Sequence, residues 1–267
     1  MPFRIVQSKQ NLRLKDLRRA LSQPGREGRP LAGIEGPHLL EEALRAGLRV
    51  ASVFVAQGAE HLLEGLPLPA ETEVLLVPRD VLDSALSTES PQPVAALVEP
   101  PSWGWEQLLG SQTKAAPLIL VLAGLQDPGN LGTILRSAEA FGVSGVLALP
   151  GTVSAWNPKA VRASAGSVFR MPLLAVSAED CFARLRAAKV KIWTTAVQGA
   201  EAAERIDLVG PVAIVIGNEG NGVPEELAAQ ADGAVTIRCP GPVESLNAAA
   251  AASVLLYEAS RQRRSLR

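Results

Sequence analysis

The stretch CPGPVESLNAAAA, residues 239–251, decides the architecture of the C-terminal half of this chain. Its two prolines and the glycine between them predict a rigid loop, and the alanine run predicts a helix that can pack closely against neighbouring backbone. We expect Ser245 to cap this helix and Asn247 to lie in its first turn. Alanine-rich helices are common, but a Pro-Gly loop that runs into Ser-Leu-Asn and such a helix is a specific combination.

A second informative segment, IGNEGNG at 216–222, follows the apolar strand VAIVIG. Glycines 217, 220 and 222 permit positive φ angles and a close approach of backbone to a ligand. Ligands of open α/β sheets gather beyond the carboxyl ends of the strands, which is where this loop falls. Glu219, the only acid in the loop, is therefore either a site residue or simply a solvated side chain on a glycine turn.

A third segment, AGLQDPGNLGTILRSAEAFG at 123–142, follows the apolar strand LILVLAG. Asp127, Pro128 and Gly129 predict a turn, and Asn130 is expected as the N-cap of a helix over 130–141. Arg136 would then project from the second turn. On this segment alone, Asn130 could serve only as a cap and Arg136 could pair only with Glu139 or a partner surface.

Taken together, the spacings N-x-G-x-x-x-R, I-G-x-E-x-x-G and P-x-G-x-x-x-S-L-N resemble the three signature motifs of the SpoU (TrmH-like) RNA ribose 2′-O-methyltransferases. This family, part of the SPOUT superfamily, uses S-adenosylmethionine (SAM). The resemblance covers residues 117–260, and a fourth stretch, K-A-x-R-A-S-A-G within 157–172, fits the same family. Because the motifs occur in order at plausible separations, chance similarity is improbable.

The resemblance implies an α/β fold whose C-terminal parallel-sheet domain carries a deep trefoil knot, a rare exception to the rule against threaded chains. It also implies a homodimer, with the site near the subunit interface. The catalytic residues implied are Arg136, Asn130, Glu219, Ser245 and Asn247. The residues implied to bind SAM are Gly217, Asn218, Glu219, Gly222, Ile237, Pro240, Leu246 and Asn247.

The uneven charge distribution supports RNA as the substrate. The formal net charge is −1, yet residues 1–29 carry eight Lys or Arg against two acids, and the last seven residues carry four Arg. Two basic ends on a neutral protein indicate local contact with phosphate. The alternative is that these charges lie on helix faces and tails that are simply solvated. The residues expected to contact RNA are Lys159, Arg162, Arg170 and, on a basic amphipathic helix at 12–21, Arg13 and Arg18.

Alternating strand and helix patterns predict a small α/β domain over residues 1–100, a linker over 101–116 and the methyltransferase domain over 117–267. The first domain resembles the substrate-binding domain, of the ribosomal protein L30/L7Ae type, that many members of the family carry. It favours ribosomal RNA over tRNA. Trp103 and Trp105 in the linker either stack on bases or anchor the linker to a domain surface.

Composition excludes several other classes of protein. Hydrophobic residues make up 47% of the 267 positions and charged residues 20%, as in a soluble globular protein. No run approaches the length of a membrane span and no signal peptide is present, so the cytoplasm is the expected location. Cys181 and Cys239 lack metal or disulfide spacing and are expected in the core, and His38 and His61 are isolated. We expect no metal.

The function predicted is SAM-dependent transfer of a methyl group to a ribose 2′-hydroxyl, with ribosomal RNA as the favoured substrate. The alternatives are a tRNA 2′-O-methyltransferase, a catalytically silent rRNA-binding assembly factor, and a nucleotide-dependent oxidoreductase. The oxidoreductase alternative is disfavoured because the chain has no phosphate-binding fingerprint after Leu122.

Overall fold

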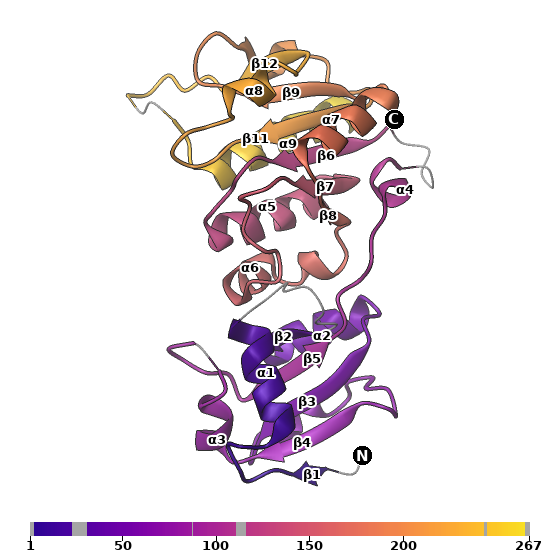
Figure 1. Ribbon diagram of the computed structural model, residues 1–267, viewed down its shortest axis with the longest axis vertical. Coiled ribbons are helices and arrows are strands. Elements are labelled where there is room, and N and C mark those ends of the chain that lie inside the picture. Colours follow the sequence, from indigo (N-terminus) through magenta and orange to yellow (C-terminus); the bar gives the residue numbers. More distant parts are fainter. Residues whose placement is uncertain (1–2, 23–30, 87, 111–115, 243–244, 265–267) are drawn as a thin grey trace. The chain divides into compact units, whose positions relative to one another are not determined.

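The computed structural model describes residues 3–22, 31–86, 88–110, 116–242 and 245–264 (Figure 1). The chain divides into two compact units. One unit comprises residues 1–102 together with 154–170, and the other comprises 103–153 with 171–267. No helix in the described ranges is long and apolar enough to cross a membrane.

The C-terminal unit is built on a seven-stranded sheet in the order β10-β12-β9-β11-β6-β7-β8. Every neighbouring pair of strands is parallel, which confirms the prediction from continuous apolar strands separated by helices. The strands are β6 (Leu118–Leu122), β7 (Gly145–Ala148), β8 (Leu173–Ala175), β9 (Lys191–Thr195), β10 (Glu201–Ala202), β11 (Val212–Ile216) and β12 (Gly233–Thr236).

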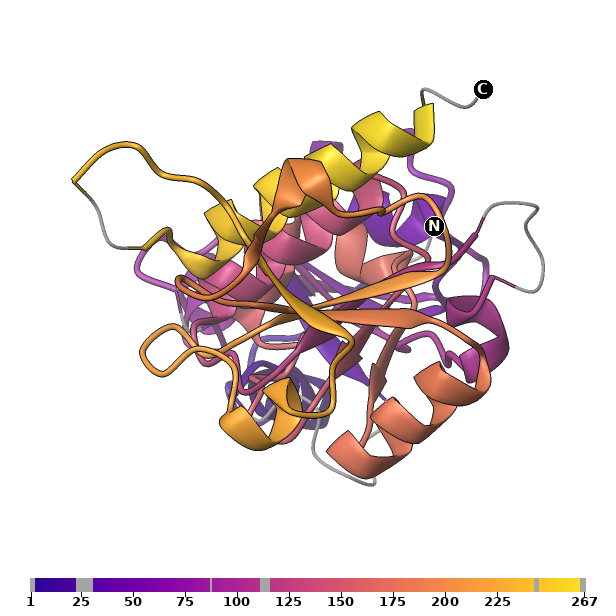
Figure 2. The same cartoon turned by 90° about the horizontal axis from the view of Figure 1, so that it is seen from above.

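Helices cover both faces of this sheet. Figure 2 shows α5 (Pro128–Ala140) and α9 (Ala248–Arg264) side by side on one face. The other face carries α4 (Trp105–Leu108), α7 (Ala178–Ala187) and α8 (Glu225–Ala228), whose apolar side chains share one core with the strands. A short 3-10 helix, η3 (Ala203–Arg205), follows β10.

The stretch expected as a linker contains a docked helix, α4. Leu108 of α4 is fully buried, and a Cβ on Gly145 of β7 would lie only 2.2 Å from its Cγ. Trp105 packs against the same core, with the guanidinium of Arg184 over its ring at 5.2 Å. Anchoring to a domain surface is therefore the observed role of Trp105. Cys181 lies in this core as expected, and burial raises its pKa to about 12.

The C-terminal arginines that the sequence suggested as a free basic tail are engaged within the fold. Arg263 donates to the carbonyl oxygens of Ala116, Pro117, Leu208 and Gly210, which ties the end of α9 to the start of the sheet. Burial lowers the pKa of its guanidinium. Arg261 and Arg264 interact with Glu258 and Tyr257 on the same helix. These three arginines therefore have partners within the fold, and contact of the basic C-terminal end with phosphate stays a prediction.

The N-terminal unit holds a five-stranded mixed sheet in the order β1-β4-β3-β5-β2, in which β5 runs antiparallel to both neighbours. Its strands are β1 (Arg4–Ile5), β2 (Ala32–Glu35), β3 (Val50–Ala56), β4 (Glu73–Val77) and β5 (Val94–Val98). Its helices are α1 (Leu12–Ser22), α2 (Pro37–Arg45), η1 (Glu60–Leu63), α3 (Arg79–Asp83), α6 (Pro158–Ser164) and η2 (Ser167–Phe169). The expected small α/β domain is present.

We predict that Leu108→Ala lowers the stability of the C-terminal unit by about 2–5 kcal/mol, because it leaves a cavity against Gly145 that α4 cannot refill. Differential scanning calorimetry would measure the change. Leu109→Ala, at the partly buried neighbouring position, should cost clearly less. Equal losses for the two variants would show that α4 is not anchored through Leu108.

Candidate active site

The three signature motifs meet at one edge of the C-terminal sheet. β12, β9, β11 and β6 are consecutive parallel neighbours, so their carboxyl ends share an edge (Figure 1). The loops at this edge span residues 123–127 after β6, 217–224 after β11, and 237–242 with 245–247 after β12. The edge is where ligands bind in open α/β sheets.

Glu219 joins two of these loops. Its Oε1 accepts hydrogen bonds from the backbone N–H of Asp127 at 3.0 Å and from Nδ2 of Asn130 at 3.1 Å. Its Oε2 accepts the backbone N–H of Gln126 at 3.1 Å. The carboxylate thus accepts the two backbone N–H groups that immediately precede α5, together with one side-chain amide from its first turn.

The surroundings of Glu219 favour its ionised form. Partial burial raises the pKa of this carboxyl, but the hydrogen bonds from Asp127, Asn130 and Gln126 outweigh the burial and hold the pKa below its usual value. A carboxylate that accepts several N–H donors is stabilised in its charged state. Glu219 is therefore a charged structural acceptor of the loop, and the reading of it as only a solvated turn residue is wrong.

Asn130 lies between Glu219 and the third motif. Its Oδ1 accepts Nδ2 of Asn247 at 3.0 Å, so its amide donates to one motif and accepts from another. The cap of α5 is Asp127, whose side chain accepts the backbone N–H of Asn130 at 2.8 Å. The expectation that Asn130 itself is the N-cap was wrong, because the Asp-Pro pair starts the helix two residues earlier than the periodicity suggested.

Asn247 caps α9. Its Oδ1 accepts the backbone N–H groups of Ala249 at 2.9 Å and Ala250 at 3.2 Å, and α9 begins at Ala248. The expected cap, Ser245, is exposed and precedes the helix, so that assignment was wrong. One side chain, Asn247, both starts the helix and reaches the first motif.

The glycine loop is held by its own backbone and by Asn218. Asn218 and Gly222 exchange two backbone hydrogen bonds of 2.9 Å, and Nδ2 of Asn218 donates to the Gly124 carbonyl at 2.8 Å. A Cβ on Gly217 would lie 2.1 Å from the Gly222 carbonyl carbon, so this position needs glycine. Of the three glycines expected to adopt positive φ, only Gly222 does so, at 68°.

Arg136 lies on α5, in the third turn of the helix that begins at the Glu219 loop. Its side chain is exposed and makes no hydrogen bond or ion pair with any described residue, so it does not pair with Glu139. Ser137, beside it, shares a 2.7 Å hydrogen bond with Ser253 of α9. The helix is thus fixed against α9 while the guanidinium of Arg136 is free to meet a substrate.

The remaining residues expected to bind SAM lie in the loop after β12. Ile237 is half-buried directly after the strand, whereas Pro240 and Leu246 are exposed. Leu246 is 38% exposed, and Val197, in the loop after neighbouring β9, is 62% exposed. These aliphatic side chains give the polar edge an apolar surface. Cys239 is also exposed, so its expected place in the core was wrong.

The cations expected to bind RNA differ in how firmly the fold engages them. Arg13 pairs with Glu73 at 2.8 Å, and Arg18 donates to the Ser84 carbonyl at 3.2 Å. Arg170 pairs with Glu42 at 2.8 Å. Lys159 and Arg162 are exposed on α6, and Arg162 makes no hydrogen bond or ion pair with a described residue.

Sequence reasoning missed two residues that hold this edge together. Asp127 caps α5, and the Asp-Pro pair that starts a helix was the available signal. Thr152, after β7, accepts the Gly124 N–H at 3.2 Å and donates to the Leu122 carbonyl at 3.0 Å, for which no local pattern gives a signal. Within the described ranges, no group of three or more His, Cys, Asp or Glu side chains could hold a metal ion.

Comparison with known proteins identifies the family. The model of the SpoU rRNA methylase family matches residues 117–257, and the model described as RNA 2′-O ribose methyltransferase substrate binding matches residues 34–103. The 23S rRNA (guanosine(2553)-2′-O)-methyltransferase RlmP of Bacillus subtilis is 32% identical over 94% of this chain and 97% of its own length.

Two solved structures resemble nearly the whole chain. The SpoU methyltransferase AviRb from Streptomyces viridochromogenes, in complex with the cofactor AdoMet, has a TM-score of 0.82 and 28% identity over 96% of this chain and 99% of its own. An AdoMet-bound rRNA methyltransferase from Sinorhizobium meliloti has a TM-score of 0.82 and 29% identity over 97% of this chain and 98% of its own. Since the methylase model matches more than half of the chain and the Bacillus subtilis relative matches nearly all of it, this chain belongs to the SpoU rRNA methylase family.

Proposed function

We propose that this protein transfers the methyl group of SAM to a ribose 2′-hydroxyl of ribosomal RNA, in the cytoplasm. The observation that carries the proposal is the hydrogen-bonded series Asn247–Asn130–Glu219, which joins the three motifs beside an exposed arginine. The substrate-binding match at 34–103 and the rRNA-modifying relative favour ribosomal RNA over tRNA.

We propose that SAM binds at the loops after β11 and β12. Gly217, Asn218, Glu219 and Gly222 would line one side, and Ile237, Pro240, Leu246 and Asn247 the other. Support comes from the exposed Leu246 and Val197, because a nucleoside needs apolar surface for its ring beside backbone groups for its polar edge. We further propose that the chain around these loops and α9 forms the trefoil knot expected for the family.

SAM supplies an activated methyl group on a sulfonium, so the protein must align the hydroxyl and help remove its proton. Arg136 would orient the 2′-hydroxyl and stabilise the negative charge that develops on its oxygen. A guanidinium keeps its own proton in proteins, so the proton from the hydroxyl passes to a phosphate oxygen or to water. Asn130 and Asn247 would fix the helix that carries Arg136, and exposed Ser245 would contact the target nucleotide.

We also propose that the protein is a homodimer through the outer face of α5 and α9. Val254 and Tyr257 of α9 are 43% and 49% exposed. They lie three residues apart on one helix face, and the Tyr257 ring packs edge-on against Phe141, which follows α5, at 5.9 Å. Apolar side chains exposed together on a helix pair are typical of a protein interface.

Incubation with deuterated SAM and unmodified rRNA should yield a labelled 2′-O-methyl nucleoside, read by mass spectrometry after nuclease digestion. Arg136→Ala should abolish the label and leave SAM affinity within about twofold by calorimetry, because Arg136 acts on the hydroxyl and not on SAM.

Label on a base, or in tRNA alone, would contradict the proposed reaction or its substrate. SAM binding without any transfer, to rRNA or to ribosomal particles, would favour a silent assembly factor. A tenfold or greater loss of SAM affinity in Arg136→Ala would contradict the role given to Arg136.

Asn247→Asp should separate the capping role of Asn247 from its role in the site. Aspartate keeps the oxygen that caps α9 but loses the amide that donates to Asn130. We expect little change in melting temperature and a fall in kcat, whereas Asn247→Ala should also lose about 0.5–2 kcal/mol of stability. Steady-state kinetics and calorimetry would test both variants. Equal kcat for Asn247→Asp and the wild type would show that the bond to Asn130 is not needed.

Val254→Arg should convert the dimer to a monomer, because the guanidinium would be buried without a partner at the proposed interface. Sedimentation equilibrium would measure the change. Leu12→Arg is the matched control, since Leu12 is also an exposed apolar residue (67%), on α1 of the N-terminal unit. A wild type that sediments as a monomer, or a Val254→Arg variant that remains dimeric, would rule out this interface.

A further inference from the structure

Residues 154–170 pack with the N-terminal unit although they lie within the stretch that matches the methylase model, 117–257. The chain leaves the C-terminal unit after Val153 and returns to it at Met171. The intervening segment carries α6, η2 and the cations Lys159, Arg162 and Arg170. The N-terminal unit therefore contains a basic segment that its own substrate-binding match, 34–103, does not include.

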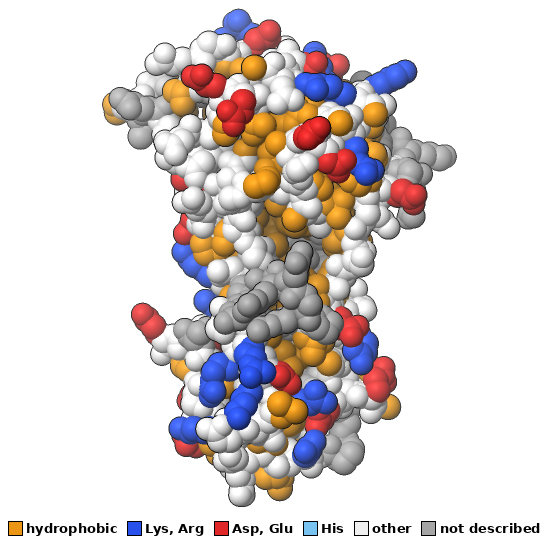
Figure 3. All heavy atoms as spheres, viewed as in Figure 1, with side chains coloured by type: hydrophobic (Ala, Val, Ile, Leu, Met, Phe, Trp, Pro, Cys, Tyr) orange, Lys and Arg blue, Asp and Glu red, His pale blue; other side chains and the backbone are white. Residues whose placement is uncertain are grey.

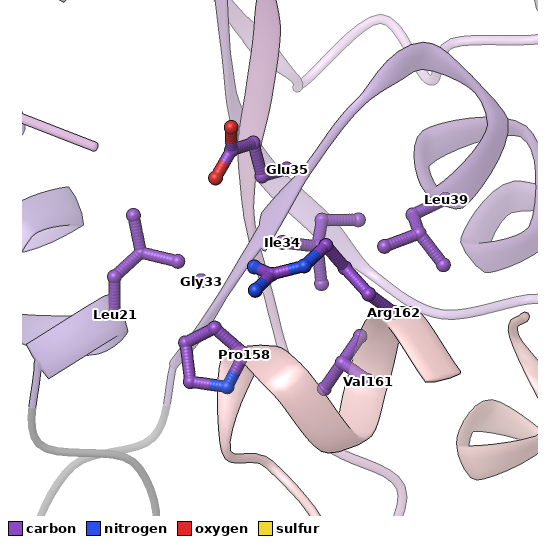
Figure 4. Close-up of a pocket in the computed structure, with 8 residues that line it drawn as sticks. All are labelled: Leu21, Gly33, Ile34, Glu35, Leu39, Pro158, Val161 and Arg162. Atoms are coloured by element: carbon purple, nitrogen blue, oxygen red, sulfur yellow. The ribbon is translucent and has the colours of Figure 1, made fainter. Parts of the chain in front are cut away.

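Apolar contacts hold the start of this segment. Figure 4 shows Pro158 and Val161 of α6 against Gly33 and Ile34 of β2. The hollow between them, which Leu21 and Leu39 also line, is too small for a water molecule, so the helix is closely packed. Trp156 and Phe169 stack at 5.9 Å and join the two ends of the segment.

An ion pair with Glu42 of α2 holds the end of the segment. The Arg170 guanidinium donates to Oε2 of Glu42 at 2.8 Å, while Arg45 donates to Oε1 at 2.7 Å. The Glu42 side chain is only 11% exposed. Gly166, with a φ of +91°, lies so close that an added Cβ would be 2.7 Å from the Cβ of Glu42. The segment is thus fitted to Glu42 by shape as well as by charge.

Burial and hydrogen bonding leave different roles for Arg170 and Arg162. Arg170 is 35% exposed and engaged by Glu42, so it is a poor phosphate ligand. Arg162 is exposed, without a hydrogen bond or ion pair to a described residue, and Figure 4 shows its guanidinium over β2. The C-terminal end of α1, at Leu21, borders the same hollow, and α1 also carries Arg18 and Arg19. Figure 3 shows Lys and Arg side chains gathered on the N-terminal unit, in the lower half of the view.

We propose that α6 completes the RNA-binding surface of the N-terminal unit, and that Glu42 is a positioning residue that holds α6 there through Arg170. The inference rests on the proposed function only in taking RNA as the partner that binds this surface. A planar guanidinium fixed on a packed helix suits a phosphate of the RNA backbone, because two N–H groups can donate to it in parallel. In this arrangement Arg162 contacts RNA and Arg170 does not.

The test compares Glu42→Gln with Glu41→Gln. Glu41 is on the same helix and also binds Arg45, at 2.6 Å, but it does not contact Arg170. We expect Glu42→Gln to weaken binding of in-vitro-transcribed rRNA by about two- to tenfold and Glu41→Gln to leave it unchanged. Fluorescence anisotropy without SAM would measure RNA affinity, and calorimetry would verify unchanged folding and SAM affinity.

A double-mutant cycle distinguishes positioning from general destabilisation. Arg162→Ala should weaken binding and reduce the slope of log affinity against log salt by about one, as for one lost phosphate contact. Adding Glu42→Gln to Arg162→Ala should then weaken binding little further, because Glu42 acts through the position of Arg162.

Fully additive effects, an equal loss for Glu41→Gln, or unchanged affinity in Glu42→Gln would each overturn the inference. So would a wild type that does not bind RNA, or polyglutamate that competes as well as RNA does. A wild type that binds rRNA with the expected cycle but transfers no methyl group would contradict the proposed function and leave this inference supported.

Discussion

The carboxylate of Glu219 is the interaction on which the rest of the site depends. Three N–H donors from the start of α5 converge on it, and one of them, from Asn130, carries the connection onward to Asn247 at the start of α9. A charged acceptor that collects donors at a helix start favours that helix both by hydrogen bonding and by its interaction with the helix dipole. The orientation of α5, and with it the position of Arg136, therefore depends on a residue in a different loop, the one after β11.

Several local requirements converge at the same sheet edge. The glycine at 217 is required by the neighbouring backbone, and Asn218 ties the loop to Gly124. Thr152 ties Gly124 and Leu122 to the turn after β7. Because buried or half-buried polar groups at this edge are bonded to one another, the loops can hold fixed positions without a regular element between them.

The sequence predicted the parallel sheet, the order of helices and strands, and the three motifs that meet at the sheet edge, because continuous apolar strands and glycine-rich loops carry those signals locally. It mispredicted the caps. Asn130 and Asn247 are of the residue type that caps helices, and only the structure shows that Asp127 takes the first cap and that Asn247, not Ser245, takes the second. A choice among adjacent capping residues depends on which oxygen reaches the free N–H groups, and spacing does not decide that.

A count of charges does not show which cations already have partners, for a related reason. A count of Lys and Arg treats every cation as available, yet Arg263 binds four backbone carbonyls, Arg13 binds Glu73 and Arg170 binds Glu42. Each of these cations already has an acceptor within the fold, and that acceptor would lose a hydrogen bond if the cation moved to a phosphate. In the proposal above, RNA binding falls mainly to Arg162, which has no acceptor among the residues that the structure describes. A protein with a net charge near zero can in this way still present a localised basic surface, defined by which arginines the fold does not use.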